Sequence, residues 1–127
     1  METSINFGAI TPVVPAADME RSLRFYVETL GFEERFRSGA PLDYAGVVRD
    51  LATLHLFSCT EPKIAEWTAF RIGVDDLDAL YARCVAAGIV HPNGAIGERP
   101  WGSRDFSVID PAGVCITFWQ RTDSEKA

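Results

Sequence analysis

The chain carries one short pattern twice, and this internal repeat limits its possible folds more than any other feature. The triplet Asp-Met-Glu at 18–20 returns as Asp-Leu-Asp at 76–78. In each copy an aspartate suited to capping a helix precedes apolar residues at helical spacing, and a glycine, Gly31 or Gly88, ends the run. The repeat predicts two related units side by side, with a cavity on the free face of each.

The first unit has the pattern of a strand, a helix and three further strands. Its helix is expected at 18–30, because Met19 and Leu23 belong to a set of apolar residues that recur on one face. Strands are expected at 5–14, 32–37, 44–49 and 52–58. Pro12 and Pro15 mark the opening strand as an edge strand, since proline cannot donate to a central ladder.

The second unit repeats this order. A helix is expected after 76–78, where Leu77, Leu80, Tyr81 and Cys84 lie at i, i+3, i+4 and i+7. Strands are expected at 67–74, near Ile89, at 105–109 and at 114–120. The sequence Asp-Pro-Ala-Gly at 110–113 has the residues that a type I turn favours, and it predicts a hairpin between the last two strands.

Length and composition favour one domain. A chain of 127 residues that is 47% hydrophobic can bury one real core, and it is too short for two independent ones. We expect a single domain over 1–127, with module one at about 1–59 and module two at about 66–121. A linker is expected at 60–66 and a polar tail at 122–127.

Charge and hydropathy narrow the choice of partners. The formal charge of −6, from 18 acidic and 12 basic residues, has the wrong sign for a phosphate backbone, so we expect no nucleic acid partner. The same charge suits a positively charged small ligand, although it can also serve solubility alone. No apolar run reaches the roughly eighteen residues of a membrane span, and the start lacks a secretion signal. The prediction is a cytoplasmic protein with no membrane partner.

No arrangement of nucleophiles stands out. Cys59, Cys84 and Cys115 are odd in number and widely spaced, which predicts reduced core thiols rather than disulfides or a zinc knuckle. Cys115 alternates onto the same side as Thr117, but no base is evident beside it. A Ser-His-Asp set and a glycine-rich phosphate loop are also missing from the sequence, so we predict no catalytic residue.

Three stretches resemble a known family. They are Pro-Val-Val through Asp at 12–18, Tyr-Ala-Gly-Val-Val-Arg-Asp at 44–50 with Thr-Leu at 53–54, and Gly-Glu-Arg-Pro-Trp-Gly at 97–102 through the turn at 110–113. On these motifs the chain resembles the vicinal oxygen chelate superfamily, which includes glyoxalase I, extradiol dioxygenases and bleomycin resistance proteins. It is most similar to the bleomycin resistance proteins. The Asp-Pro-x-Gly turn marks the superfamily, and the other motifs are narrower signals.

The resemblance implies an architecture. It is an α+β fold of two paired βαβββ modules, each a curved sheet with its helix outside, assembled as a homodimer with a ligand groove between subunits. The first strand is exchanged between partners about a hinge proline, which aligns with Pro12. A proline-bracketed edge strand independently suits such an exchanged arm.

Metal-dependent members of the superfamily bind one divalent ion through the first and last strands of each module. Carried over by position, those places fall near Thr11, His55, Ala69 and Thr117. A catalytic metal ordinarily needs about three side-chain donors of the His, Cys or carboxylate type, and only His55 is one. We therefore predict no metal site and no cofactor.

His55 itself has two interpretations. Strand alternation places Leu54 and Leu56 under the helix and His55 toward the cavity. There the imidazole could hydrogen-bond a ligand or change charge near neutral pH. The alternative is a neutral histidine bonded to a neighbouring strand or to water.

Several aromatic residues stand where core packing is not their obvious purpose. Trp101 lies in a polar loop at 97–105, where a large ring gains little unless it covers something. By the resemblance, Phe36, Tyr44 and Trp101 match positions that line the drug groove of bleomycin resistance proteins, where a planar part of the drug stacks and acidic residues meet its cationic tail. Core packing for Phe36 and a cross-strand pair for Tyr44 are the alternatives.

The ligand-binding residues predicted in this way are Phe36, Asp43, Tyr44, His55, Phe57, Glu98, Trp101, Gly102, Cys115 and Thr117. Asp43 and Glu98 are the candidate acids, and plain solvation is their alternative role. Arg71 and Arg104 would disfavour a cationic ligand if they face the groove.

These observations predict a homodimeric, metal-free binding protein that sequesters a planar, cationic molecule of the bleomycin type. Antibiotic resistance would follow without chemical change to the drug. One alternative is a metal-dependent glyoxalase-like lyase, isomerase or dioxygenase that uses other ligands. Another is a binder of an unrelated aromatic metabolite.

Overall fold

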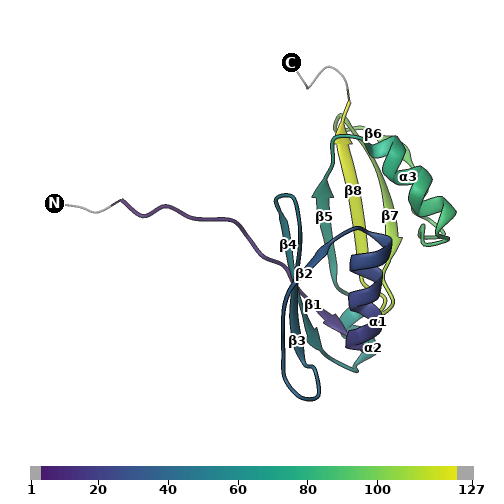
Figure 1. Ribbon diagram of the computed structural model, residues 1–127. Helices are drawn as coiled ribbons and strands as arrows, with labels where there is room; N and C mark the ends of the chain where they lie inside the picture. Colours follow the sequence, from purple (N-terminus) through teal and green to yellow (C-terminus); the bar gives the residue numbers. More distant parts are fainter. Residues whose placement is uncertain (1–3, 123–127) are drawn as a thin grey trace.

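The computed structural model describes residues 4–122 and has an α+β fold with two four-stranded sheets (Figure 1). The first half comprises β1 (Val13–Ala16), α1 (Met19–Arg24), η1 (Phe25–Thr29), β2 (Glu33–Ser38), β3 (Tyr44–Arg49) and β4 (Ala52–Ser58). The second comprises β5 (Ala69–Gly73), α3 (Leu77–Ala86), β6 (Gly97–Arg99), β7 (Ser103–Ile109) and β8 (Cys115–Arg121). A short helix, α2 (Pro62–Glu66), connects them. The polar tail expected at 122–127 lies outside the described residues from 123 onward.

The two sheets have the same topology. Their strand orders are β1-β4-β3-β2 and β5-β8-β7-β6, so the first strand of each half pairs with the last. That pairing is parallel in both sheets, and the remaining pairs are antiparallel. The repeat seen in the sequence is therefore a repeat of structure, which confirms the expected order of a strand, a helix and three strands in each half.

The repeated triplets begin helices as expected. The Asp18 carboxylate accepts from the Arg21 amide at 3.1 Å, and the Asp76 carboxylate accepts from the Ala79 amide at 3.1 Å. Gly31 and Gly88 follow the helix ends at φ of 76° and 70°, a region in which a β-carbon would clash with the backbone. The first helix finishes as the π-helical turn η1 rather than as regular α-helix.

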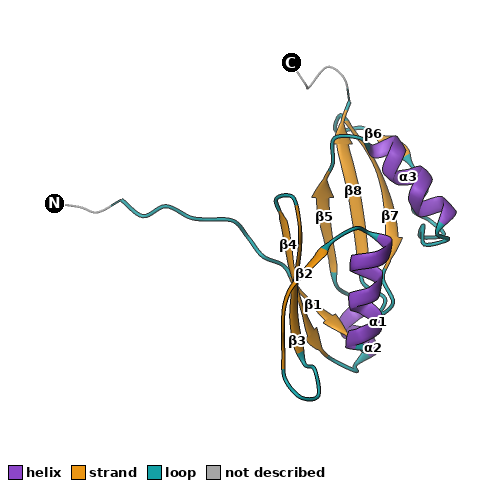
Figure 2. Cartoon of the chain, in the orientation of Figure 1, coloured by secondary structure: helices purple, strands orange, loops and turns teal. Residues whose placement is uncertain are grey.

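Each helix covers one face of its sheet and leaves the other face free (Figure 2). Val14, Val47 and Leu56 alternate onto the helix side of the first sheet, and Phe106 and Ile116 do so in the second; all are buried. The free faces consequently carry the residues of the opposite parity, and several of the predicted site residues are among them.

The opening strand is shorter than expected. Strand pairing begins at Val13, whereas residues 4–12 are extended and lead away from both sheets (Figure 1). The predicted strand at 5–14 is wrong over this stretch, because the segment runs away from the sheets and forms no strand pairing within the described residues. Ile5, Phe7 and Ile10 are 82%, 95% and 89% exposed.

Three further expectations are corrected. The strand expected near Ile89 is only an isolated bridge between Val90 and Val108, and the third strand of the second sheet is β6. The linker at 60–66 contains α2, which Glu61 caps by accepting from the Lys63 amide. Of the three thiols expected in the core, Cys84 is buried, whereas Cys59 and Cys115 are half-buried.

One buried hydrogen bond joins the two halves. The Tyr26 hydroxyl donates to Asp110 Oδ2 at 2.7 Å, while Asp110 Oδ1 accepts from the amides of Ala112, Gly113 and Val114. The hairpin predicted at 110–113 is thus confirmed, and its aspartate also anchors the first helix. Within the described residues, no helix is long and apolar enough to cross a membrane.

Candidate functional site

The free face of the first sheet carries an aromatic cluster of Phe36, Tyr44 and His55. The Phe36 and Tyr44 rings are stacked with centroids 6.1 Å apart and an interplanar angle of 22°. The His55 ring meets both edge-on, at 5.2 Å from Phe36 and 5.4 Å from Tyr44. Three of the predicted site residues, from three different strands, therefore form one contiguous surface.

Local sequence explains how these rings reach one another. Phe36 lies on β2 opposite Gly46 of β3, and Gly46 lies opposite His55 of β4. A β-carbon at Gly46 would overlap the Phe36 ring, so only glycine lets this ring lie down on the sheet. A register shift between Glu34 and Phe36 re-aims the end of β2.

His55 is held in this cluster by a hydrogen bond. Its Nδ1 lies 2.9 Å from the Tyr44 hydroxyl on the neighbouring strand. Leu54 and Leu56 are buried on the helix side, as strand alternation predicts, and His55 is half-buried on the free face. The structure therefore bonds the imidazole to a neighbouring strand and keeps its ring on the surface where a ligand would lie.

Two more predicted residues border the cluster. Phe57 is half-buried and pairs with Tyr44 across β3 and β4, so both side chains share the free face. Asp43 is exposed in the turn that precedes β3, directly before Tyr44. Its carboxylate lies against Gly39 in the same turn, where it would overlap a β-carbon built on that glycine.

The free face of the second sheet is more polar. Cys115 and Thr117 lie on it, and the Thr117 hydroxyl is 2.8 Å from the Ser107 hydroxyl of β7. Asp105, also on β7, is 5% exposed and receives Arg99 Nε at 2.8 Å and Nη2 at 2.7 Å, both on Oδ1. Arg71 Nη2 approaches the other oxygen of this carboxylate at 4.0 Å.

Two predicted residues of the second half lie away from this face. Glu98 pairs across the sheet with Arg104, whose guanidinium binds Asp78 of α3, so Glu98 belongs to the helix side and is exposed there. Because β6 is a strand, alternation turns the Glu98 side chain away from the free face within one chain, and its role as a ligand-binding acid stays a prediction. Trp101 lies with Gly102 in the β6–β7 turn and is 68% exposed.

The predicted residues therefore form two groups within one chain. Phe36, Asp43, Tyr44, His55 and Phe57 gather on the first sheet. Cys115 and Thr117 lie on the second sheet, and Trp101 and Gly102 lie at its end.

Arg71 and Arg104, the two arginines that could disfavour a cationic ligand, lie on opposite faces of the second sheet. Arg71 lies on the free face beside Thr117 and is half-exposed, whereas Arg104 lies on the helix side. The Asp78 carboxylate raises the pKa of Arg104, and Arg104 lowers the pKa of Asp78. Of these two arginines, Arg71 is the one that bears on the charge of a ligand at the free faces.

The positions that would hold a divalent metal do not fit one. Strand register puts Val13 opposite His55 and Arg71 opposite Thr117, each two residues beyond Thr11 and Ala69. Valine, arginine and threonine cannot complete a set of three His, Cys or carboxylate donors. Over residues 4–122, no group of three or more His, Cys, Asp or Glu side chains is placed to hold a metal ion.

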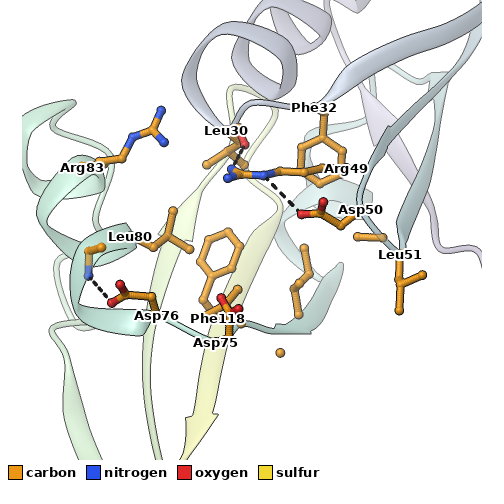
Figure 3. Close-up of a pocket in the computed structure, with 15 residues that line it drawn as sticks. Leu30, Phe32, Arg49, Asp50, Leu51, Asp75, Asp76, Leu80, Arg83 and Phe118 are labelled. Carbon is orange, nitrogen blue, oxygen red and sulfur yellow. Dashed lines mark hydrogen bonds and ion pairs between the residues drawn. The ribbon is translucent and has the colours of Figure 1, made fainter.

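A cavity of about 490 Å³ lies between the end of the first helix and the second sheet, rather than on a free face (Figure 3). Its apolar part includes Leu30, Phe32 and Phe118, and Arg49 donates to the Leu30 carbonyl at 2.7 Å within it. None of the ten predicted site residues lines this cavity. Sequence reasoning missed it because its walls come from both halves.

Sequence reasoning also missed the cluster of Arg71, Arg99 and Asp105. The three residues lie on three strands, β5, β6 and β7, and no spacing in the sequence brings them together. Arg99 falls inside the polar loop expected at 97–105, where no strand parity is defined, whereas Asp105 opens the strand expected at 105–109. The alternation of Asp105 with buried Phe106 is the signal that could have identified it.

Comparison with known proteins is consistent with this architecture. The family model described as Glyoxalase/Bleomycin resistance protein/Dioxygenase superfamily matches residues 8–118. A bleomycin resistance protein of Geobacillus stearothermophilus is 31% identical over 130 residues, covering 89% of this chain and 96% of that protein.

Solved structures agree with the sequence match. The bleomycin-binding protein from bleomycin-producing Streptomyces verticillus, complexed with copper(II)-bleomycin, superposes with a TM-score of 0.77 at 35% identity, over 91% of this chain and 97% of that one. A bleomycin resistance determinant encoded on the transposon Tn5 has a TM-score of 0.77 at 26% identity, over 91% and 98% of the two chains. This chain therefore belongs to the glyoxalase/bleomycin resistance protein/dioxygenase superfamily.

Proposed function

We propose that this protein binds a planar, cationic molecule of the bleomycin type in the cytoplasm and sequesters it without chemical change. The observation that carries the proposal is the cluster of Phe36, Tyr44 and His55, an aromatic surface that the core does not need. The similarity to proteins described as bleomycin-binding supports it. Resistance would follow by mass action, because bound drug cannot reach its target.

The chemistry of the cluster suits a flat ligand with a positive tail. Stacking contributes about 0.5–1.5 kcal/mol beyond area burial for each ring, and a cation over an exposed ring contributes about 0.5–1 kcal/mol. Asp43 is exposed and directly precedes Tyr44 in the chain, and the chain as a whole carries a charge of −6. Binding through these contacts needs neither a metal nor another cofactor.

We further propose that the protein, one domain over 1–127, works as a homodimer with the ligand groove between its copies. Within one chain, Trp101 belongs to the second sheet, whereas the aromatic cluster lies on the first. A second copy of the chain is the simplest way to place a Trp101 side chain opposite the cluster and so close a groove. The apolar stretch at 4–12 supports an exchanged arm, with Pro12 as the hinge. The Pro12 carbonyl accepts from the His55 amide at 2.9 Å, which ties the base of the arm to the strand that carries His55.

Calorimetric titration with metal-free and copper-loaded bleomycin tests the proposal. We expect saturable binding near one drug per chain and recovery of unmodified drug after denaturation of the complex. Tyr44→Ala should weaken binding about tenfold or more, because it removes one ring and the partner of His55. Trp101→Ala should weaken it similarly if the turn of one copy faces the rings of the other.

Trp67→Ala is the matched control, since Trp67 is also an exposed tryptophan but stands at the end of α2. It should leave affinity unchanged. Absence of binding to both forms of the drug, or recovery of altered drug, would overturn the proposal.

A further inference from the structure

Trp119 is a large aromatic side chain on the free face of the second sheet. It lies on β8 with the parity of Cys115 and Thr117, and it is half-buried. Its neighbour Phe118 has the opposite parity and is 4% exposed on the helix side, which α3 covers (Figure 2). Packing of the hydrophobic core therefore does not account for the position of the Trp119 indole.

The indole lies against the backbone of the neighbouring strand. Trp119 is opposite Gly73 of β5, and a β-carbon at Gly73 would come within 3.1 Å of Cζ2 and 3.2 Å of Cε2 of the indole. Carbon atoms in good contact are about 3.5–4.0 Å apart, so glycine at this position lets the ring lie this close to the sheet. Gly46 accommodates the Phe36 ring of the aromatic cluster in the same way.

The internal repeat makes Trp119 the counterpart of Phe57. The repeated helix-capping triplets are 58 residues apart, and the same interval separates Pro15 from Gly73. Pro15 lies opposite Phe57 in the first sheet, as Gly73 lies opposite Trp119 in the second. Phe57 shares its free face with the aromatic cluster, so both halves of the chain place an aromatic side chain at the same point of the free face.

The side chains around Trp119 are polar. Asp105 lies opposite it on β7, and Thr117 and Arg71 lie in the next row across the strands. Over residues 4–122 the indole makes no contact with another aromatic ring, and its N–H donates no hydrogen bond although the nitrogen is accessible. A tryptophan that serves packing alone usually bonds its N–H when it is buried. The ring and its donor are therefore both open to a ligand.

The nearest acid does not make this surface a second site for a cation. Asp105 Oδ1 receives Arg99 Nε at 2.8 Å and Nη2 at 2.7 Å, and Arg71 Nη2 lies 4.0 Å from Oδ2. A cation on the indole would meet a carboxylate that two guanidinium groups already approach. An uncharged ring avoids this conflict and still gains the stacking contact.

We propose that Trp119 is a second stacking platform, which binds an uncharged planar heteroaromatic group on the free face of the second sheet. The backbone at Gly73 supports one side of the indole, and the ligand ring stacks on the other side in an offset arrangement. The hydroxyls of Ser107 and Thr117, 2.8 Å apart, lie in the next row and can bond polar groups at the edge of the ligand. This inference does not depend on the function proposed for the aromatic cluster, because no residue of that cluster takes part.

Caffeine is a suitable probe, because it is planar, heteroaromatic and uncharged. Two variants of the full chain carry a single tryptophan each: Trp67→Phe with Trp101→Phe keeps Trp119, and Trp101→Phe with Trp119→Phe keeps Trp67. Caffeine should quench the Trp119 emission saturably, at a half-saturating concentration at least about fivefold lower than for Trp67. Trp67 is the matched control, because it is 87% exposed but lies outside the free face.

Gly73→Ala in the chain that keeps Trp119 should weaken quenching about threefold or more, because the new β-carbon displaces the ring. This variant is expected to fold, since Gly73 is not among the glycines with positive φ. Trp119→Val is a second test, because valine suits a strand but offers no ring. Saturation transfer from the protein to the caffeine methyl protons should be lost in Trp119→Val and retained in Trp67→Val.

Equal quenching of the two single tryptophans, quenching of Trp119 that rises without saturation, or undiminished quenching in Gly73→Ala would overturn the proposal. Undiminished saturation transfer in Trp119→Val would also overturn it. Failure of bleomycin binding would overturn only the function proposed for the aromatic cluster, because caffeine binding is read from Trp119 itself.

Discussion

At the scale of single residues, the bond between Tyr26 and Asp110 connects parts of the chain that the repeat would otherwise leave independent. Both side chains are buried, and their oxygens are 2.7 Å apart. Burial, with the charge of Asp110 acting in the same direction, holds the pKa of the Tyr26 hydroxyl well above its usual range. The phenol therefore remains protonated, and able to donate this hydrogen bond, at ordinary pH.

Tyr26→Phe should lower the free energy of unfolding by about 1–3 kcal/mol, because it leaves a buried carboxylate oxygen without its donor. Tyr81→Phe is the matched control. The Tyr81 ring packs edge-on against Phe106 with centroids 5.0 Å apart, and over the described residues its hydroxyl makes no hydrogen bond. It should change stability by less than about 0.5 kcal/mol. Urea denaturation of both variants measures this, and equal losses would contradict the assigned role.

Asp110 also predicts a pH dependence. Burial raises the pKa of its carboxyl, although the hydrogen bonds that it accepts act against the shift. The folded state then holds the proton more tightly than the unfolded chain, so this group's contribution to stability is present below the ordinary aspartate pKa and is lost as pH rises through the raised value.

The difference in the free energy of unfolding between wild type and Asp110→Asn should therefore change steadily with pH. Between about pH 3 and pH 7, the free energy of unfolding of wild type should fall relative to that of the variant as pH rises. Urea denaturation at a series of pH values gives both curves. A difference that is constant with pH would show that the carboxyl titrates alike in both states.

At the scale of elements, the two helices are the part of the fold that local sequence specifies best. Each has an aspartate cap, an apolar stripe and a terminal glycine, and these signals need no partner from elsewhere in the chain. The residues at which strands begin and end depend on pairing with other parts of the chain. The segment at 5–12 has the composition of a strand but no sheet edge beside it, and β6 was hidden in a loop rich in Pro and Gly.

Replacing either cap tests this local control. Asp18→Ala and Asp76→Ala should each cost about 1 kcal/mol of stability, because each leaves helix amides without an acceptor. Asp75→Ala is the control: its carbonyl accepts from Gln120, and over the described residues its carboxylate makes no bond. It should be within about 0.5 kcal/mol of wild type by thermal or urea denaturation. A loss at Asp75 as large as at Asp76 would refute the capping explanation.

At the scale of the whole molecule, the exposed N-terminal segment is the observation that bears on the proposed exchange of an arm between two copies. Three large apolar side chains, at Ile5, Phe7 and Ile10, lie in water while the base of the segment is paired to β4. Full burial of one such side chain is worth about 1.5–3 kcal/mol. A second copy that covered them would gain several kilocalories per mole from this segment.

The triple variant Ile5→Ser, Phe7→Ser and Ile10→Ser should therefore raise the dimer dissociation constant at least tenfold. Sedimentation equilibrium of variant and wild type measures it. Trp67→Ser removes a side chain that is equally exposed but lies outside the segment, and it should have no effect. An unchanged dissociation constant in the triple variant, or a wild type that is monomeric at all concentrations, would contradict arm exchange.

Much of this molecule follows from local rules that act along the chain. Alternation and helical spacing predicted the two modules, the side of the sheet on which His55 lies, and the turn at Asp110, because each depends on neighbours within a few residues. Family resemblance added Phe36, Tyr44 and Trp101 as groove residues; the structure stacks the rings of Phe36 and Tyr44 and places Trp101 in the β6–β7 turn.

Tertiary structure alone decided which strands become neighbours. The strand order brings Arg71 and Arg99 close to the buried carboxylate of Asp105, and the register of β6 places Glu98 on the helix side. The packing of the two halves also leaves two cavities where they meet. The physical reason is that strand pairing joins residues far apart in sequence, and both parity and register must be known before their charges can be added. The sequence determined which side chains each strand carries on its two faces. The packing of the two sheets determined which of those side chains come into contact.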